Sequence, residues 1–485
     1  HANVANFFAG MDARVTRHDD RPNVWLSVTS ISFDISVMEL FWTLARGFHV
    51  VLQVEERKRI VSPGFETSVS VSGRSTTPSR SSGHPSNEHS SAGGAVSFSL
   101  FYFSSDEKLD RDRGLASKKY QLLLDGAAYA DTHGYEAIWT PEGHFHDFGG
   151  LYPNPSVISA AIAARTEKVQ IRAGSCVSPL HHPVRIAEDW AVVDNLSNGR
   201  VGISFAAGWQ PNDFVLQPQN FADRKALMFD QIEDVRALWR GESRVYDGPT
   251  GNPVEVQTLP RPVQTELPVW ITAAGNPETF RMAGKGGYNI LTHLLGQSVD
   301  ELTEKLAIYR NAWKDAGHSG VGRATLMLHT FVGEDEASVK AAVREPMKSY
   351  LRSSIALIKK AAWSFPTFKN RTTDLSGGFS LDGLSDEEID AVLDYAFERY
   401  YNNSGLFGTP AQCMERVAEV AAAGVDEIAC LLDFGLPAET VVEHLPHLRK
   451  VKEASDAQWS EDAPDAVTHA QGDGQSTDMQ TVFSA

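Results

Sequence analysis

The sequence predicts an α/β fold over residues 96–450, because two patterns alternate eight times there. Short apolar runs rich in Val, Ile and Phe indicate buried strands, and longer amphipathic stretches indicate helices. The expected strands are Val96–Phe103, Glu136–Thr140, Val169–Ala173, Val201–Phe205, Pro268–Thr272, Asn289–Thr292, Ala324–Val332 and Asp426–Leu432. Eight parallel strands with right-handed crossovers close most naturally into a (β/α)8 barrel, whose active sites lie at the carboxyl ends of the strands.

The composition excludes several classes of function. A net charge of −18 is unsuited to binding nucleic acid, which needs a basic face. No apolar run approaches the roughly 20 residues that span a bilayer, and no signal peptide opens the chain. The three cysteines form no CxxC pair and are too few for a disulfide framework. We therefore expect a cytoplasmic protein with no nucleic-acid or membrane partner.

The segments on either side of the barrel differ from it in composition. Residues 62–95 are rich in Ser, Gly and Pro and are expected to form a flexible linker. Residues 453–485 contain acidic residues but no Lys or Arg, which predicts a disordered tail. Residues 1–61 contain a patterned apolar segment that is too short for a core of its own. The barrel domain itself is expected to occupy residues 96–452.

The N-terminal segment carries a known pattern. Its stretch Trp25–Gly47 includes Phe33-Asp34-Ile35-Ser36, and this resembles the Phe-Asp-x-Ser motif of adenylation domains in nonribosomal peptide synthetases. In that family the aspartate, here Asp34, binds the α-amino group of the amino acid to be activated. Residues 1–61 are therefore interpreted as a fragment of an adenylation domain. The fragment is assigned no activity, because the phosphate-binding loop and the later motifs are missing from the sequence.

The barrel region resembles the luciferase-like flavin monooxygenases, in particular those embedded in nonribosomal peptide synthetases. The matching stretches follow the family's order along the chain. They are Trp139–Phe145, Ala173–Asp189, Leu196–Ser204, Phe205–Phe214, Trp270–Thr279, Gly408–Gln412 and Ala423–Glu427. The resemblance implies reduced FMN as a bound cosubstrate, O2 as the oxidant, and a separate flavin reductase.

A phosphate site is expected after the fifth strand. Asn276 is a suitable N-cap and Pro277 suits the first turn of a helix, whose N-terminus attracts a phosphate. Gly275 has no side chain to keep the phosphate away, and Thr279 adds a hydroxyl. An ordinary capped helix is the alternative. Gly208, Trp209 and Gln210, after the fourth strand, are expected to form a neighbouring wall of this site. The residues expected to bind FMN are therefore Gly208, Trp209, Gln210, Ala274, Gly275, Asn276 and Thr279.

The turn after the second strand is expected to do the chemistry. Luciferase relatives often carry Glu-His-His where this chain has Glu142-Gly143-His144, so Gly143 fills the position of the luciferases' catalytic histidine. His144 and His146 are the expected proton donors, with Glu142 fixing the tautomer of His144. Cys176 falls where luciferases hold a thiol beside the flavin, or is a small apolar filler. The adjacent residues His181 and His182 are interpreted as structural.

The resemblance predicts a monooxygenase domain that hydroxylates an aminoacyl group on a carrier protein, at the α-carbon in preference to the nitrogen. The host adenylation domain would be a further partner, and a homodimer is compatible with the sequence. Two alternatives remain open. One is a metal-dependent hydrolase using His144, His146, His293 and Asp433, and the other is a non-catalytic spacer. Residues 344–408, with helices expected at Glu345–Phe365 and Ser385–Tyr401, are interpreted as a lid, a docking surface or packing filler.

Overall fold

The computed structural model describes residues 24–27, 49–52, 96–103, 120–145, 149–353 and 385–461. The chain divides into two compact units, His1–Pro85 and Ser86–Ala485. In the first unit, β1 (Val24–Ser27) and β2 (His49–Leu52) pair in parallel. The Phe-Asp-x-Ser motif and the Ser/Gly-rich segment lie outside the described residues.

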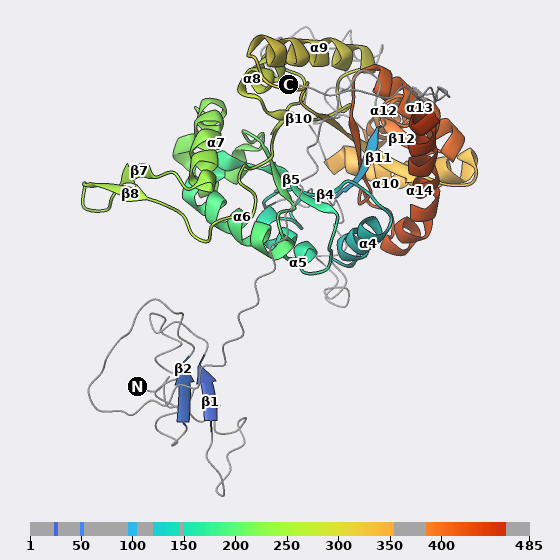
Figure 1. Cartoon of the computed structure of the whole chain (residues 1–485). Coiled ribbons are helices and arrows are strands. Elements are labelled where there is room, and N and C mark those ends of the chain that lie inside the picture. Colours follow the sequence, from blue (N-terminus) through green and yellow to red (C-terminus); the bar gives the residue numbers. More distant parts are fainter. Residues whose placement is uncertain are drawn as a thin grey trace, which may run out of the picture. The chain divides into compact units, whose positions relative to one another are not determined.

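The second unit contains a closed barrel of eight parallel strands. Figure 1 shows helices arranged around these strands. In order around the barrel they are β3 (Ser97–Phe101), β4 (Ala137–Thr140), β5 (Gln170–Cys176), β6 (Val201–Phe205), β9 (Val269–Thr272), β10 (Asn289–His293), β11 (Ala324–Val332) and β13 (Glu427–Leu431). The pairings of β10 with β11 and of β13 with β3 close the ring. The predicted (β/α)8 barrel is therefore confirmed, and each strand lies where an apolar run predicted it.

The helices surround this ring. They are α4 (Gln121–Thr132), α5 (Pro155–Ala163), α6 (Pro183–Ser197), α7 (Arg224–Arg240), α8 (Pro277–Gly286), α9 (Val299–Asp315), α10 (Glu336–Ser353), α13 (Pro410–Ala422) and α14 (Ala438–Glu461). Four of them begin with Pro directly after a capping side chain, from Asn154, His182, Asn276 or Thr409. Proline suits this position because it lacks an N–H that would have no intrahelical partner. Among the described residues, no helix is long and apolar enough to cross a membrane.

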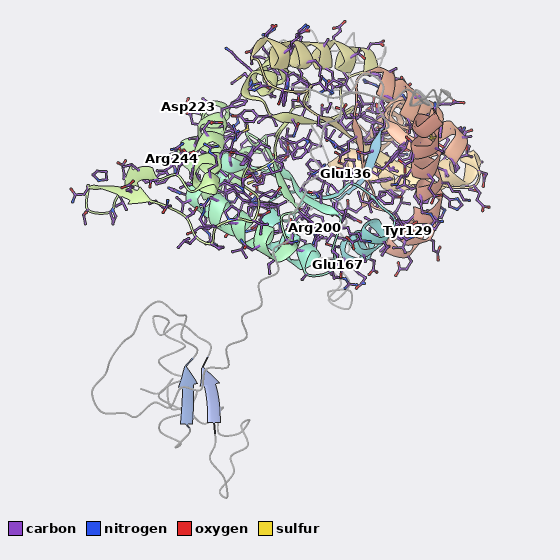
Figure 2. All side chains as sticks on the ribbon, in the orientation of Figure 1. Tyr129, Glu136, Glu167, Arg200, Asp223 and Arg244 are labelled. Carbon is purple, nitrogen blue, oxygen red and sulfur yellow. The ribbon has the colours of Figure 1, made fainter. Side chains whose placement is uncertain are left out.

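Two insertions interrupt the alternation of strands and helices in the barrel. Between α7 and β9, the antiparallel hairpin β7 (Arg244–Asp247) and β8 (Pro253–Val256) projects from the barrel beside α7 (Figure 1). Arg244, labelled in Figure 2, anchors its base to Asp234 of α7 at 3.0 Å. This hairpin was not predicted from the sequence.

The second insertion follows β11. It contains α12 (Asp386–Asn403) and β12 (Gly405–Gly408), which extends the ladder of β11. The predicted helix at 385–401 is confirmed. The one predicted to begin at Glu345 begins earlier, at Glu336, and contains Pro346 within its length. Residues 354–384 lie outside the described ranges, and at the C-terminus α14 continues past Lys452 to Glu461.

A charged network packed against the rings of Trp139 and Trp270 lies at the amino-terminal end of the barrel interior. Glu427 is fully buried, and its carboxylate accepts hydrogen bonds from Arg172 at 2.8 Å and Arg323 at 2.9 Å. Arg172 also pairs with Glu136, which Figure 2 labels in the barrel wall. Further donors to Glu427 are Ser99, Trp139 and Thr325. Burial opposes the negative charge, but the two arginines lower the pKa of Glu427 to about 2.

Candidate active site

The carboxylate of Glu142, directly after β4, organises the candidate site at the carboxyl end of the barrel. Its side chain is fully buried. Oε1 lies 3.0 Å from Nε2 of His144 and 2.6 Å from Nε2 of His181, and Oε2 accepts the backbone N–H of Val177 at 2.7 Å. Burial alone would raise the pKa of Glu142, but these hydrogen bonds and the attraction of His181 hold it below its ordinary value. The carboxylate is therefore ionised at neutral pH.

The turn that carries His144 is packed tightly at Gly143. A Cβ built on Gly143 would lie 2.8 Å from the carbonyl oxygen of Gly149. The Gly143 N–H donates to the carbonyl of Tyr152 at 3.0 Å, which fixes the turn from the other side. Phe145 follows with a left-handed φ of 60° and an exposed ring. There is consequently no room for the luciferases' histidine at position 143.

The histidines of this region differ in their surroundings. His144 meets Glu142 as predicted, and its side chain is 9% exposed. His182 caps α6, accepting the N–H of Val184, so its structural interpretation is confirmed. His181 was interpreted in the same way, but its ring reaches Glu142 instead of a helix end. His146 lies outside the described residues.

Cys176 ends β5 beside this group, and its thiol is buried. Burial, followed by the charges of Glu142 and Asp189, raises the pKa of Cys176 well above its ordinary value. The thiol is therefore protonated at neutral pH and does not act as a thiolate nucleophile in this state. This environment fits the small apolar filler better than the reactive thiol of the two roles considered.

A metal-dependent hydrolase would need several strand-end ligands close together. Among the described residues, the ligand atoms of Glu142, Cys176 and His181 form the one such group, within 4.8 Å of one another. His293 and Asp433 do not belong to it, and Asp433 instead accepts the N–H of Phe103 at 2.6 Å. Both oxygens of Glu142 already accept protein donors. The arrangement is a hydrogen-bonded network, not the ligand set that the hydrolase alternative requires.

The expected phosphate site has the predicted helix start. Asn276 caps α8, with its side chain accepting the N–H of Glu278 at 2.9 Å, and Pro277 is the first helical residue. The N–H of Thr279 donates to the carbonyl of Asn276 at 3.0 Å. The first helical turn therefore has its amides already paired. A Cβ on Gly275 would meet nothing within 4 Å, so open space lies just before the helix.

The wall expected at Gly208–Gln210 follows β6. Gly208 has a φ of 81°, and a Cβ there would lie 2.9 Å from the Phe214 ring. Trp209 is 55% exposed, so it is not a core residue. Arg224 of α7 donates to the carbonyl of Gly208 at 3.1 Å. This cation beside the wall was not predicted, because it lies in an unpatterned loop-to-helix junction.

Hydroxyl groups connect the ends of three neighbouring strands, β5, β6 and β9. Thr272, at the end of β9, bonds Ser204 of β6 at 2.7 Å and also contacts Ser175 of β5. Ser175 precedes Cys176, and Thr272 precedes the Ala273–Asn276 loop. The carboxyl ends of β4, β5, β6 and β9 thus bring the Glu142 group and the Gly275 loop to one rim of the barrel.

Comparisons with known proteins identify the family of the barrel. The sequence profile of the luciferase-like monooxygenases matches residues 100–427. The oxygenase component of a flavin-dependent trigonelline monooxygenase from Acinetobacter baylyi is 26% identical over 331 residues, covering 68% of this chain and 87% of that protein.

Solved structures share the fold. The oxygenating constituent of 3,6-diketocamphane monooxygenase from Pseudomonas putida, in complex with FMN, has a TM-score of 0.58 at 16% identity and covers 75% of this chain and 99% of its own. An F420-dependent secondary alcohol dehydrogenase has a TM-score of 0.52 at 14% identity, covering 74% and 99%. With the profile match over most of the barrel, these findings establish that the chain belongs to the luciferase-like monooxygenase family.

Proposed function

We propose that this protein is an FMN-dependent monooxygenase that receives reduced FMN from a separate reductase. The observation that carries the proposal is the buried Glu142–His144 pair at the strand ends of a barrel from this family. The trigonelline relative is named as an oxygenase component, and the camphane enzyme was solved with FMN. A deazaflavin such as F420 is the rival cofactor, since a structural neighbour uses it.

The residues of the rim fit a flavin with a phosphate tail. The open space at Gly275 and the Thr279 hydroxyl would hold the phosphate, and Trp209 and Gln210 would flank it. Glu142 and its hydrogen-bonded partners His144 and His181 would lie against the flavin ring. When bound, reduced FMN supplies the two electrons that reduce O2, so that one oxygen atom enters the substrate and the other leaves as water.

The protein's own part in the reaction is to orient donors and exclude water. Ionised Glu142 accepts from Nε2 of His144 and so fixes that ring's orientation and tautomer. With its Nε2 hydrogen held by Glu142, His144 would offer its other ring nitrogen, Nδ1, to the reacting oxygen, and it would donate a proton there only while both ring nitrogens are protonated. The buried Cys176 adds an apolar surface to the site, which limits the access of bulk water.

The substrate proposal rests on the N-terminal segment. Phe33–Ser36 resembles an adenylation-domain motif, so residues 1–61 are proposed to be a fragment of the host, joined by 62–95 to the barrel. An oxygenase tethered in this way works at a high effective concentration, on the order of millimolar, near a carrier protein. We therefore expect an aminoacyl thioester on the carrier's phosphopantetheine arm as substrate, with hydroxylation at the α-carbon favoured over hydroxylation at the nitrogen.

The test is intact mass spectrometry of an aminoacyl carrier protein. The protein, FMN, a flavin reductase, NADH and O2 are incubated with carriers loaded with different amino acids. A gain of one oxygen atom on one of them supports the proposal, and fragmentation locates the atom. Flavin oxidation that yields hydrogen peroxide alone with every loaded carrier would contradict the substrate, and turnover with F420 but not FMN would contradict the cofactor.

A further inference from the structure

One carboxylate oxygen serves two imidazoles in this site. Oε1 of Glu142 lies 2.6 Å from Nε2 of His181 and 3.0 Å from Nε2 of His144. Since an ionised carboxylate can only accept, both Nε2 atoms must carry hydrogen. The shorter distance makes His181 the closer partner of the ionised carboxylate, and an ionised donor would strengthen this hydrogen bond further.

We propose that His181 holds a proton against Glu142 and thereby sets how strongly the site prefers reduced over oxidised flavin. The proposal rests on the proposed FMN function. Reduced FMN carries a negative charge on its ring at neutral pH, whereas the oxidised ring is neutral. Protonated His181 and ionised Glu142 sum to zero charge, but when His181 loses its proton, Glu142 alone remains as a buried negative charge that repels the reduced ring.

His181 is better placed than His144 to hold this proton. Its side chain is 27% exposed against 9% for His144, so the cation keeps more of its hydration. Its backbone is anchored from two elements: the N–H donates to Ser178 at 2.9 Å, and the carbonyl accepts from Gln231 of α7 at 3.1 Å. The ring is therefore held against Glu142 instead of moving into solvent.

The charged and titratable groups around His181 favour its cation. Glu142 and His144 face it from the turn after β4, and the protonated Cys176 from the end of β5. The carboxylate of Asp189, on α6, attracts the His181 cation at longer range. Arg185 partly neutralises this carboxylate, with its guanidinium 2.8 Å from the Asp189 oxygen. The side chain that α7 contributes is the neutral Gln231.

Together these effects raise the pKa of His181. Burial alone would lower the pKa of His181, but its hydrogen bond to Glu142 and the attraction of Glu142 and Asp189 raise it above the ordinary value. The proton is therefore retained through a range in which a free histidine is neutral, and it is lost as the pH rises through the raised pKa.

The first arm of the test needs no flavin. The pKa of His181 is measured by NMR titration of the imidazole carbons in the full chain, with His181→Gln assigning the signal. We expect a pKa above that of a free histidine, and a clear decrease in Glu142→Gln, where the countercharge is removed. An unchanged pKa in a folded Glu142→Gln would overturn the inference.

The second arm measures dissociation constants of reduced and oxidised FMN under anaerobic conditions across the pH range. Because reduced FMN itself titrates, wild type is compared with His181→Gln at each pH. We expect wild type to favour reduced FMN over oxidised FMN roughly ten-fold more than the variant does below the pKa of His181, with the advantage vanishing above it. His144→Gln is the matched control and should keep this pH dependence.

The outcomes separate the two proposals. No binding of FMN in either redox state would overturn the proposed function together with this inference. Binding of both forms with the same preference in wild type and His181→Gln would overturn the inference alone. The same holds if His144→Gln, and not His181→Gln, removes the pH dependence.

Discussion

The backbone of Gly143 packs directly against that of Gly149, so that a Cβ at position 143 would lie 2.8 Å from the Gly149 carbonyl oxygen and 2.9 Å from its carbon. The neighbouring atoms are backbone and cannot rotate away. This contact explains why the chain departs from the luciferase pattern here, and it fixes where the turn presents the next residue, His144.

Gly143→Ala should therefore destabilise the protein and displace His144 from Glu142. Relieving the overlap requires a backbone shift, which costs about 1–3 kcal/mol of unfolding free energy. Denaturant unfolding measures this cost. Gly275→Ala is the matched control, since its Cβ enters open space and should leave stability nearly unchanged. Equal stability of the two variants would show that the turn relaxes freely.

The fold was predictable from the sequence because the strand signal is local. Strands such as Val201–Phe205 and Ala324–Val332 are buried along almost their full length. A strand buried on both faces is a nearly continuous apolar run, which can be recognised from the sequence alone. The hairpin β7–β8 was not predicted because its strands are largely exposed and therefore carry no apolar run.

The site was predictable only in part. The Glu142–His144 contact links residues two apart in the sequence, so its proximity follows from local geometry. The His181–Glu142 contact depends on the packing of β4 beside β5 and on the helical turn after Cys176, which no sequence spacing reveals. Adjacent histidines also look alike in sequence, although His182 caps a helix and His181 meets the carboxylate.

The phosphate prediction is tested by Gly275→Glu. Because space is open around this position, the new side chain fits without disturbing the fold, and its charge would repel the phosphate. We expect FMN affinity to fall by roughly ten-fold or more in a fluorescence titration. Riboflavin, which lacks the phosphate, should lose much less affinity. Equal losses for both ligands, or none for FMN, would place the phosphate elsewhere.

Removal of residues 1–93 tests the proposed domain boundaries. The barrel strand β3 begins at Ser97, and the backbone carbonyl of Val96 accepts a hydrogen bond from Ser455 of α14, so the truncation keeps both. Flavin-dependent O2 consumption should be retained. A folded truncated protein without FMN binding would mean that the N-terminal segment belongs to the flavin site.

His144→Ala should keep FMN binding but divert electrons to hydrogen peroxide. Losing an acid–base group lowers the productive step by roughly 10²–10⁴-fold in general, and we expect product per flavin oxidised to fall by at least about ten-fold. Product and peroxide are measured in one quench series. His133→Ala, at the end of α4 and outside the site, is the control. Full coupling in His144→Ala would leave His144 a structural role.

Glu427 is expected to be a major determinant of stability. In Glu427→Gln, the buried guanidinium of Arg172 and the partly buried one of Arg323 lose their fully buried countercharge and keep Glu136, although the amide keeps the shape. Breaking a buried ion pair in this way costs about 3–5 kcal/mol. Glu255→Gln, at an exposed position of β8, should change stability little.

The pH dependence of this effect follows from the pKa of Glu427, which falls from an ordinary 4.5 to about 2 on folding. A group with a lowered folded pKa contributes its full stabilisation above the unfolded value and loses it as the pH falls through the folded value. The shift corresponds to roughly 3 kcal/mol. The difference in unfolding free energy between wild type and Glu427→Gln should therefore be constant above pH 4.5 and shrink towards pH 2. Denaturant titrations across this range measure it, and a difference that does not depend on pH would mean that packing, and not the charge of Glu427, stabilises the barrel interior.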